Sequence, residues 1–219
     1  MKKILFIHGW GQTKEVWKGI EKYLKDEYKC YFITLKGFDD PSKLDYAYTP
    51  YDYAKELYEK YKDIDFIVAH SYGAKVALEY ILNFLEVPLL LIGPAIIKPK
   101  KSFSIKLKIL KYKILKRLNK INNDLESIDY KNSIGKMRTV FRYAINTYYN
   151  EEIKILDSKI TLLYGNDDLT TPLKEGKRIV KLNKKIKLLK MDGGHSCFIN
   201  NPIRFVMILN KWVSKYGDN

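Results

Sequence analysis

The chain has 219 residues, of which 46% are hydrophobic, so it is long enough to bury one full core and short for two domains. Two cysteines, Cys30 and Cys197, are too few for a disulfide framework, and we expect a reducing, cytoplasmic location. The apolar run at residues 4–7 is too short for the core of a signal peptide or for a membrane span, so the sequence predicts no stable membrane insertion.

The net charge of +15 comes mainly from lysine, since only five of the 40 basic residues are arginine. Lys, Tyr, Ile and Asn are residues that an AT-rich genome supplies in excess, so codon bias is one interpretation of the basic surface. Attraction to an acidic partner is the other. Residues 98–150 hold fourteen basic and three acidic residues, which is +11 of the total, whereas codon bias should spread the charge more evenly. No recognition motif accompanies the charge, so we expect no nucleic-acid binding.

Strands and helices alternate along the first part of the sequence. Lys3–His8 is a short apolar run that predicts a buried strand, and apolar residues at helical spacing predict a helix over Glu15–Glu27. The elements that follow are a strand at Cys30–Leu35, a helix at Tyr51–Tyr61, a strand at Asp65–Ala69, a helix at Lys75–Phe84 and a strand at Val87–Ile92.

A long segment without a convincing strand interrupts this alternation. Within it, apolar residues recur at steps of three and four and predict one face of a helix: Leu107, Leu110, Ile114, Leu118 and Ile121. A second helix is expected over roughly Ile134–Tyr149. We interpret residues 97–152 as an inserted, basic helical cap. Two more strands, at Ile160–Tyr164 and Ile186–Met191, and a final helix at about Pro202–Lys215 complete the chain.

The order of these elements predicts an α/β fold in a single domain of residues 1–219. Its centre should be a mostly parallel sheet of about six strands, flanked by helices on both faces. Open sheets of this kind bind their ligands at the carboxyl ends of the strands, so the cap should lie over the ligand site.

The sharpest chemical signal is Ala69-His70-Ser71-Tyr72-Gly73, which lies between a predicted strand and a predicted helix. Small residues two positions before and two after the serine allow the strand to turn sharply into the helix, which exposes the hydroxyl. The segment resembles the nucleophile elbow Gly-x-Ser-x-Gly of α/β hydrolases, with Ala69 in place of the first glycine. The resemblance implies the α/β-hydrolase fold and makes Ser71 the candidate nucleophile.

A serine nucleophile needs a base, and the sequence holds three histidines. His70 adjoins the nucleophile and should point away from it, and His8 precedes a glycine-rich turn. His195 remains, in a Gly-Gly-His segment after the last strand, which is where α/β hydrolases carry their catalytic histidine.

The acid that orients the histidine should come between the serine and the histidine in the chain. Residues 165–172 read Gly-Asn-Asp-Asp-Leu-Thr-Thr-Pro and resemble the Gly-x-x-Asp-x-x-x-Pro segment of α/β hydrolases, which puts Asp168 in the acid's place. Asp167 is the competing candidate, although a helix-capping role fits it better.

Two backbone N–H groups should form the oxyanion hole. The N–H of Tyr72, directly after the nucleophile, is one candidate. The other is the N–H of Trp10, because His8-Gly9-Trp10-Gly11 matches the His-Gly turn after the first strand of α/β hydrolases. The Trp10 ring is also expected to line the acyl pocket.

Within the superfamily, His8-Gly9-Trp10-Gly11 together with Val16-Trp17 most resembles the pimeloyl-carrier-protein methyl ester esterases. This resemblance implies a serine hydrolase that cleaves a carboxylic ester or thioester through an acyl-enzyme. It also implies, as partners, a small acyl ester and an acidic acyl carrier protein.

Arg138 and Arg142 of the cap are candidate substrate-binding residues, because arginine holds phosphate or carboxylate through two parallel hydrogen bonds. The scattered histidines and two cysteines give no metal-ligand spacing, so we expect no metal and no cofactor. Two alternatives remain: a non-catalytic ligand-binding protein on a hydrolase fold, and a membrane-surface protein that uses the basic amphipathic cap helix.

Overall fold

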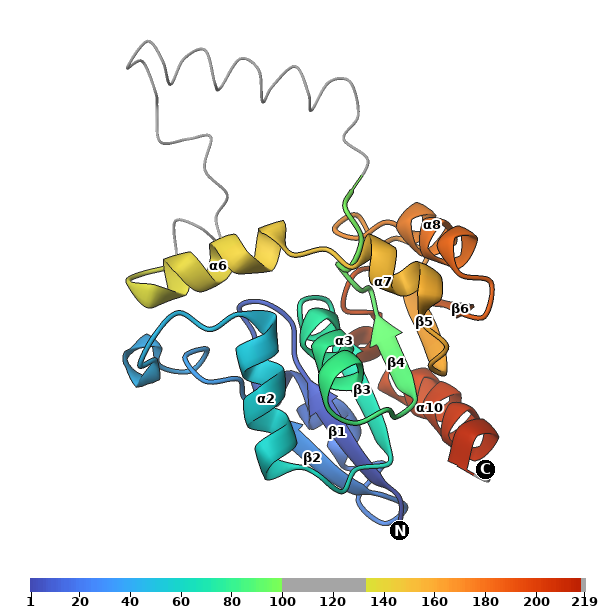
Figure 1. Ribbon diagram of the computed structural model, residues 1–219. Coiled ribbons are helices and arrows are strands. Elements are labelled where there is room, and N and C mark those ends of the chain that lie inside the picture. The colour runs from blue at the N-terminus through green and yellow to red at the C-terminus, as the bar shows by residue number, and fades with distance from the viewer. Residues whose placement is uncertain (100–132, 218–219) are drawn as a thin grey trace.

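The computed structural model describes residues 1–99 and 133–217 (Figure 1). Most of the predicted cap, including the helix expected from Leu107 to Ile121, lies outside these residues.

A six-stranded sheet forms the centre of the protein, in the order β2-β1-β3-β4-β5-β6. Every neighbouring pair of strands is parallel. Because parallel strands need long crossover connections, helices must lie between them in the sequence and cover the sheet. The strands are β1 (Lys3–Ile7), β2 (Lys29–Ile33), β3 (Phe66–His70), β4 (Leu89–Ile92), β5 (Ile160–Gly165) and β6 (Lys187–Met191).

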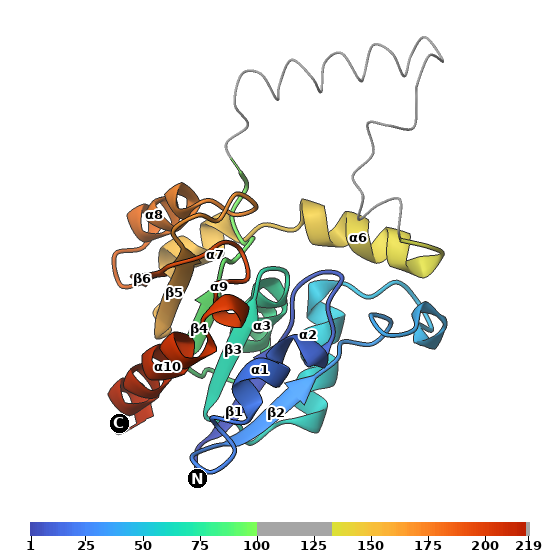
Figure 2. The same ribbon diagram turned by 180° about the vertical axis from the view of Figure 1, so that it is seen from behind.

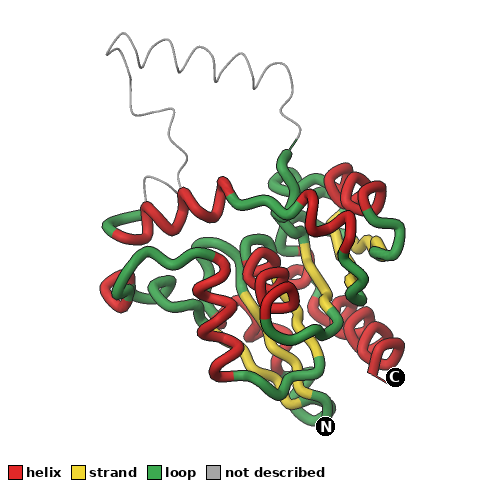
Figure 3. Tube along the Cα trace, in the orientation of Figure 1, coloured by secondary structure: helices red, strands yellow, loops and turns green. Residues whose placement is uncertain are grey.

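Helices lie on both faces of this sheet (Figures 1, 2 and 3). The helices of residues 1–99 and 133–217 are the 3₁₀ helices η1 (Lys14–Trp17) and η2 (Pro41–Lys43), and the α-helices α1 (Lys18–Glu21), α2 (Pro50–Lys60), α3 (Gly73–Asn83), α6 (Lys136–Asn146), α7 (Asn150–Ile155), α8 (Leu173–Leu182), α9 (Cys197–Asn200) and α10 (Pro202–Gly217). In the described part of the chain, no helix is both long enough and apolar enough to cross a membrane.

The alternation of side chains along the strands builds one core on each face. Leu5 and Ile7 of β1 pack into the core that α2, α3, α7 and α8 cover. Ile4 and Phe6 point to the opposite core, under α1, α9 and α10. The central strand β3 is buried along its whole length. Helix α6 crosses the end of the sheet toward which the strands point (Figure 1).

The predicted fold class is confirmed, and the six predicted strands are present, with no end shifted by more than two residues. The prediction of one helix over Glu15–Glu27 was wrong in its second half. Val16, Trp17, Ile20 and Leu24 pack against the core as their spacing predicts. However, the chain leaves the α-helix after Glu21 and continues in turns, in which the N–H of Leu24 donates to the carbonyl of Glu21. The sequence reading also missed α7, α8 and α9.

Gly73 shows how tightly α3 packs against the sheet. A Cβ atom at Gly73 would lie 2.6 Å from the carbonyl oxygen of His8 and 2.8 Å from that of Ile7, so backbone would have to move. Gly73→Ala should therefore lower the free energy of unfolding by about 1–3 kcal/mol. At Gly19 in α1, a Cβ would have no neighbour within 4 Å. Gly19→Ala is thus the matched control and should raise stability by about 0.5–1 kcal/mol.

Urea unfolding of the two variants measures both effects. Equal stability of the two alanine variants would show that α3 can move away from β1 at little cost.

Candidate active site

The turn from β3 into α3 holds Ser71 in a strained conformation. Its φ of 51° is the only positive value at a non-glycine residue in the described part of the chain. The Ser71 N–H donates to the carbonyl of Ile92 at 2.9 Å, which ties the turn to the end of β4. Strain of this kind costs about 1–3 kcal/mol and concentrates at functional sites. This geometry is that of a nucleophile elbow.

Small residues make the elbow possible. Ala69 is fully buried in β3, and Gly73 lies against the backbone of β1, as described above. Gly9, in the turn after β1, lies next to the serine, since a Cβ built on Gly9 would be 3.2 Å from the Ser71 Cβ. Bulky side chains at these positions would push Ser71 away from the strand ends.

Asp168 and His195 form a hydrogen-bonded pair, in which the His195 Nδ1 lies 2.8 Å from the Asp168 Oδ2. They come from the loops after β5 and β6, at the same end of the sheet as Ser71. The carboxyl of Asp168 is buried. Although burial by itself raises the pKa of Asp168, the hydrogen bonds from His195 and Thr171 outweigh it and hold the pKa below its usual value. Asp168 is therefore an ionised acceptor for His195.

Backbone donors fix which oxygen of Asp168 faces the histidine. The N–H groups of Thr170 and Thr171 both donate to Oδ1, each at 2.8 Å, which leaves Oδ2 for His195. The Thr171 hydroxyl lies 2.8 Å from Oδ2 and 3.0 Å from the carbonyl oxygen of Gly93. Gly93 is in a left-handed conformation, and a Cβ there would be 3.0 Å from the His195 Nδ1. Glycine at the end of β4 thus leaves room for the pair.

The two other histidines are buried and hydrogen-bonded elsewhere. The N–H of Leu35 donates to the His8 Nε2, so the proton of His8 is on Nδ1, which donates to the carbonyl of Gly9. Burial lowers the pKa of His8 to about 4. Burial, together with the nearby His195, lowers the pKa of His70 to about 3. Both rings are neutral at pH 7 and support the site without titrating.

His70 joins the two halves of the site. Its Nδ1 lies 2.9 Å from the side-chain oxygen of Gln12, and its Nε2 lies 3.1 Å from the carbonyl oxygen of His195. Gln12 in turn accepts the backbone N–H of Gly9. This chain of contacts connects the turn after β1 with the histidine loop after β6.

Trp10 and Tyr72 each leave a backbone N–H without a hydrogen-bond partner among the described residues. Both groups flank Ser71: Tyr72 follows it, and Trp10 follows Gly9, which lies against it. Two unpaired N–H groups beside one hydroxyl are what an oxyanion hole requires.

Aromatic side chains surround this end of the site. The Trp10 ring contacts Phe38, Tyr72 and Phe141 edge-to-face, with centroids 5.0–5.5 Å apart. A hollow of about 320 Å³ beside Trp10 reaches under α6 and is lined by Trp10, Gly11, Gly37, Phe38, Pro41, Ser133, Ile134 and Met137. The lining offers both apolar side chains and polar groups.

Arg138 and Arg142 lie one turn apart on α6, and both are exposed. The Arg138 Nε donates to the carbonyl of Ser133 at 3.2 Å. Within the described residues, the Ser71 hydroxyl has no hydrogen bond, so the structure pairs Asp168 with His195 but does not hydrogen-bond Ser71 to them.

Cys197, two residues after His195, is buried, and burial raises the pKa of its thiol to about 11, so it is unsuited as a nucleophile. Residues 1–99 and 133–217 contain no cluster of three or more side chains that could hold a metal ion.

Sequence reasoning missed three residues of the site. Thr171 and Gly93 contact the Asp168–His195 pair, and Gln12 bridges His70 and Gly9. Thr171 could have been predicted, because a hydroxyl three residues after an aspartate can donate a hydrogen bond back to its carboxylate. No pattern in the sequence marks Gln12.

A parallel sheet with a strained serine after one strand and a hydrogen-bonded Asp–His pair after two others defines a hydrolase of the α/β type. The sequence matches the alpha/beta hydrolase family over residues 4–207, and the chain belongs to this family.

One similar protein is the pimeloyl-[acyl-carrier protein] methyl ester esterase of Wigglesworthia glossinidia brevipalpis. It is 24% identical over 252 aligned positions, which cover 98% of this chain and 94% of the relative. Among solved structures, a thermophilic esterase from Thermogutta terrifontis has a TM-score of 0.73 at 17% identity. The superposition covers 99% of this chain and 90% of the esterase chain. An esterase from Exiguobacterium antarcticum has a TM-score of 0.73 at 16% identity, with 98% and 92% covered. At such identities the two structures show a common fold.

Proposed function

We propose that this protein is a serine carboxylic ester hydrolase with Ser71 as nucleophile, His195 as base and Asp168 as the acid behind it. The observation that carries the proposal is the Asp168–His195 hydrogen bond at the strand ends where Ser71 occupies a strained elbow. Membership of the hydrolase family and the likeness to esterases support the same reaction type.

In the proposed reaction, the Ser71 oxygen attacks the ester carbonyl while the His195 Nε2 takes the hydroxyl proton. The ionised Asp168 stabilises the imidazolium that forms. The carbonyl oxygen becomes negative and accepts hydrogen bonds from the backbone N–H groups of Trp10 and Tyr72. His195 then protonates the leaving alcohol, and a water molecule activated by His195 releases the acid from Ser71.

The acyl group should lie under α6, against Trp10 and the hollow beside it. Hydrolysis of p-nitrophenyl esters of increasing acyl length tests the reaction type and this pocket together. We expect saturable hydrolysis, with kcat/KM rising with chain length until the hollow is filled. Absence of hydrolysis above the buffer rate for every chain length would leave the non-catalytic binding protein as the better interpretation.

We further propose that the natural substrate is an ester carried by an acidic acyl carrier protein. The printed function of the Wigglesworthia relative supports this substrate class. The concentration of +11 charges in residues 98–150 supports an acidic partner, and Arg138 and Arg142 are exposed residues of α6. The same comparison supports a methyl ester at the end of a carrier-bound acyl chain as the form of this substrate.

The dependence of kcat/KM on salt concentration should distinguish docking of a carrier protein from the hydrolysis step itself. Between about 50 and 300 mM salt, kcat/KM for the carrier-bound ester should fall steeply, because exposed charges are screened beyond about 8–10 Å. The free short-chain ester should change little. Arg138→Glu combined with Arg142→Glu should reproduce the loss for the carrier-bound ester at low salt.

Lys22→Glu combined with Lys25→Glu is the matched control, because these exposed lysines follow α1 on the other face of the sheet. It reverses the same amount of charge away from α6. Equal salt dependence for both esters, or an equal loss in the control variant, would contradict docking at α6 and favour codon bias as the origin of the lysines.

A further inference from the structure

Lys75 is a buried charged residue that the proposed reaction does not use. It lies on α3, four residues after Ser71, and is only 2% exposed. Burial lowers the pKa of its ammonium group to about 8, so the group is still mostly charged at pH 7. Among the described residues, no carboxylate lies within 4.0 Å of it. Because burial of such a charge costs free energy, an apolar side chain of similar length should fit α3 at a lower cost.

The ammonium group of Lys75 is directed at the end of α6. Its Nζ donates to the carbonyl oxygens of Ala144 and Thr147, each at 2.5 Å, and lies 4.7 Å from the centre of the Tyr148 ring. Ala144 is in the last turn of α6, and Thr147 is the C-cap residue. Carbonyls at this end of a helix have no partner within the helix and carry the negative end of its dipole. Lys75 therefore fastens the end of α6 to the helix that follows the nucleophile.

Helix α6 in turn contacts the opposite side of the candidate active site. Phe141, three residues before Ala144 on α6, meets the Trp10 ring edge-to-face, with centroids 5.0 Å apart. Trp10 carries one of the two candidate oxyanion N–H groups and lines the hollow beside it. A shift of the end of α6 away from Lys75 would therefore also change the wall of this hollow.

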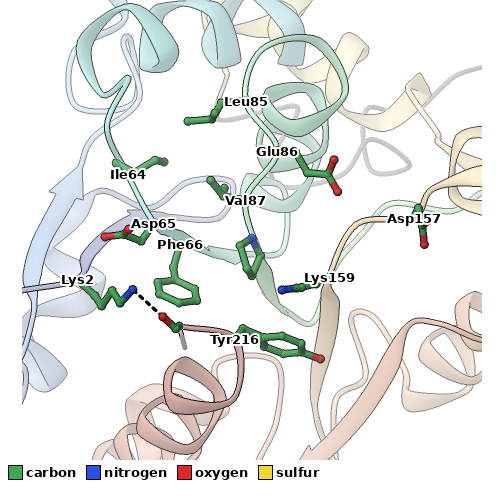
Figure 4. A pocket seen from close by; sticks show the side chains of 12 residues that line it. Lys2, Ile64, Asp65, Phe66, Leu85, Glu86, Val87, Asp157, Lys159 and Tyr216 are labelled. Carbon is green, nitrogen blue, oxygen red and sulfur yellow. Dashed lines mark hydrogen bonds between the residues drawn. The ribbon is translucent and has the colours of Figure 1, made fainter. Parts of the chain in front are cut away.

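Lys2 makes the same kind of contact without burial. Its Nζ donates to the carbonyl of Gly217, the last residue of α10, at 2.7 Å. Lys2 is exposed and lies at a cavity of about 510 Å³ where the strands begin, which the acidic residues Asp65 and Glu86 also line (Figure 4). Lys2 thus holds a helix end at the surface, whereas Lys75 holds one with a buried charge close to Ser71.

We propose that Lys75 is a positioning residue that holds α6 over the hollow beside Trp10 and thereby sets which acyl chains the hollow accepts. This inference rests on the proposed ester hydrolysis and adds to it a residue that determines acyl-chain preference. The ammonium group acts through α6 and does not contact the substrate. Its loss should therefore weaken binding of long acyl chains and leave the chemical step at Ser71 unchanged.

Lys75→Met removes the charge and keeps a side chain of similar length. The KM for p-nitrophenyl octanoate should rise at least about tenfold, with kcat within about twofold of the wild type. For p-nitrophenyl acetate, whose acyl group is too short to fill the hollow, neither constant should change. The urea midpoint of unfolding should equal or exceed that of the wild type, because a buried charge is removed.

Two further variants separate positioning from a general effect of substitution. Phe141→Leu breaks the connection at its other end, the contact with Trp10, and should raise the KM for the octanoate ester in the same way. Lys2→Met is the matched control, because it also removes an ammonium group from a carbonyl at a helix end. It should leave the kinetics of both esters unchanged.

The indole N–H signal of Trp10 in a ¹H–¹⁵N spectrum reports the position of α6 in the absence of substrate. The Phe141 ring shifts this signal while the two rings are in contact, and the Trp10→Phe variant identifies it. We expect Lys75→Met to move the Trp10 signal and to leave the signals of Trp17 and Trp212, which lie in the core on the other face of the sheet, unmoved.

An unmoved Trp10 signal in Lys75→Met would overturn the proposal. So would an equal rise of KM for both esters, a urea midpoint below that of the wild type, or the same effects in Lys2→Met. Wild-type protein that hydrolyses neither ester would contradict the proposed function instead, and the Trp10 signal would still decide whether Lys75 positions α6.

Discussion

Replacement of Ser71 by alanine is expected to lower kcat for ester hydrolysis by roughly 10⁴–10⁶-fold while the fold is retained. The loss follows from the proposed role of Ser71, because Tyr72, the other residue between β3 and α3 that carries a hydroxyl, is buried. Activity that remains would come from the oxyanion hole and from substrate binding alone. A fluorophosphonate should label the wild type on the peptide that contains Ser71, as read by mass spectrometry.

Ser71→Gly provides a second variant with a different signature. At a φ of 51°, glycine relieves the strain that serine or alanine carries, so this variant should lose activity and gain roughly 1 kcal/mol in stability. Ser214→Ala, on the exposed side of α10, is the matched control for loss of a hydroxyl. Wild-type protein that reacts with no fluorophosphonate, or a Ser71→Ala variant with wild-type kcat, would refute the nucleophile assignment.

Asp168→Asn should lower kcat by roughly 10⁴-fold through the protonation state of His195. The backbone N–H groups of Thr170 and Thr171 hold the Oδ1 position, so the amide oxygen of asparagine should occupy it. The amide NH₂ then faces the His195 Nδ1 in place of Oδ2. A ring that accepts at Nδ1 carries its proton on Nε2 and can no longer take the proton of Ser71.

Asp167 is the natural control for this substitution, because it is adjacent in sequence and its side chain is exposed. Asp167→Asn should leave kcat within about twofold of the wild type, since the backbone N–H of Asp167, and not its carboxylate, holds the loop through the carbonyl of Gly193. Steady-state kinetics on one p-nitrophenyl ester measures both variants. The reverse ranking would move the acid to Asp167.

The parts of this protein that sequence could predict are those with a local signature. Buried parallel strands are continuous apolar runs, so the number of strands and their order along the chain could be predicted from the sequence. Ser71, Asp168 and His195 each follow a predicted strand in a short motif, and the pairing of Asp168 with His195 was expected from the resemblance of these motifs to those of α/β hydrolases.

Features that depend on tertiary packing could not be predicted from the sequence. Helix α8 has a glycine in its middle, which normally disfavours a helix. A Cβ at Gly176 would lie 2.6 Å from the Tyr164 ring, so close packing of α8 on β5 selects glycine there. Likewise, the contact of Gln12 with His70 joins residues that are far apart in the sequence.

The all-parallel sheet also has a consequence for how the chain folds. No two paired strands are joined by a hairpin, and even β3 and β4 are separated by the whole of α3. A long loop must therefore close before each pair of strands can form, and the hydrogen bonds of the pair offset the lost chain entropy only afterwards. This order of events makes folding slow. Because β3 pairs with β1 on one side and with β4 on the other, Ser71 reaches its native position only after both pairings have formed. Unpaired apolar strands persist during that interval, and at high concentration they can associate between chains before any active molecule has formed.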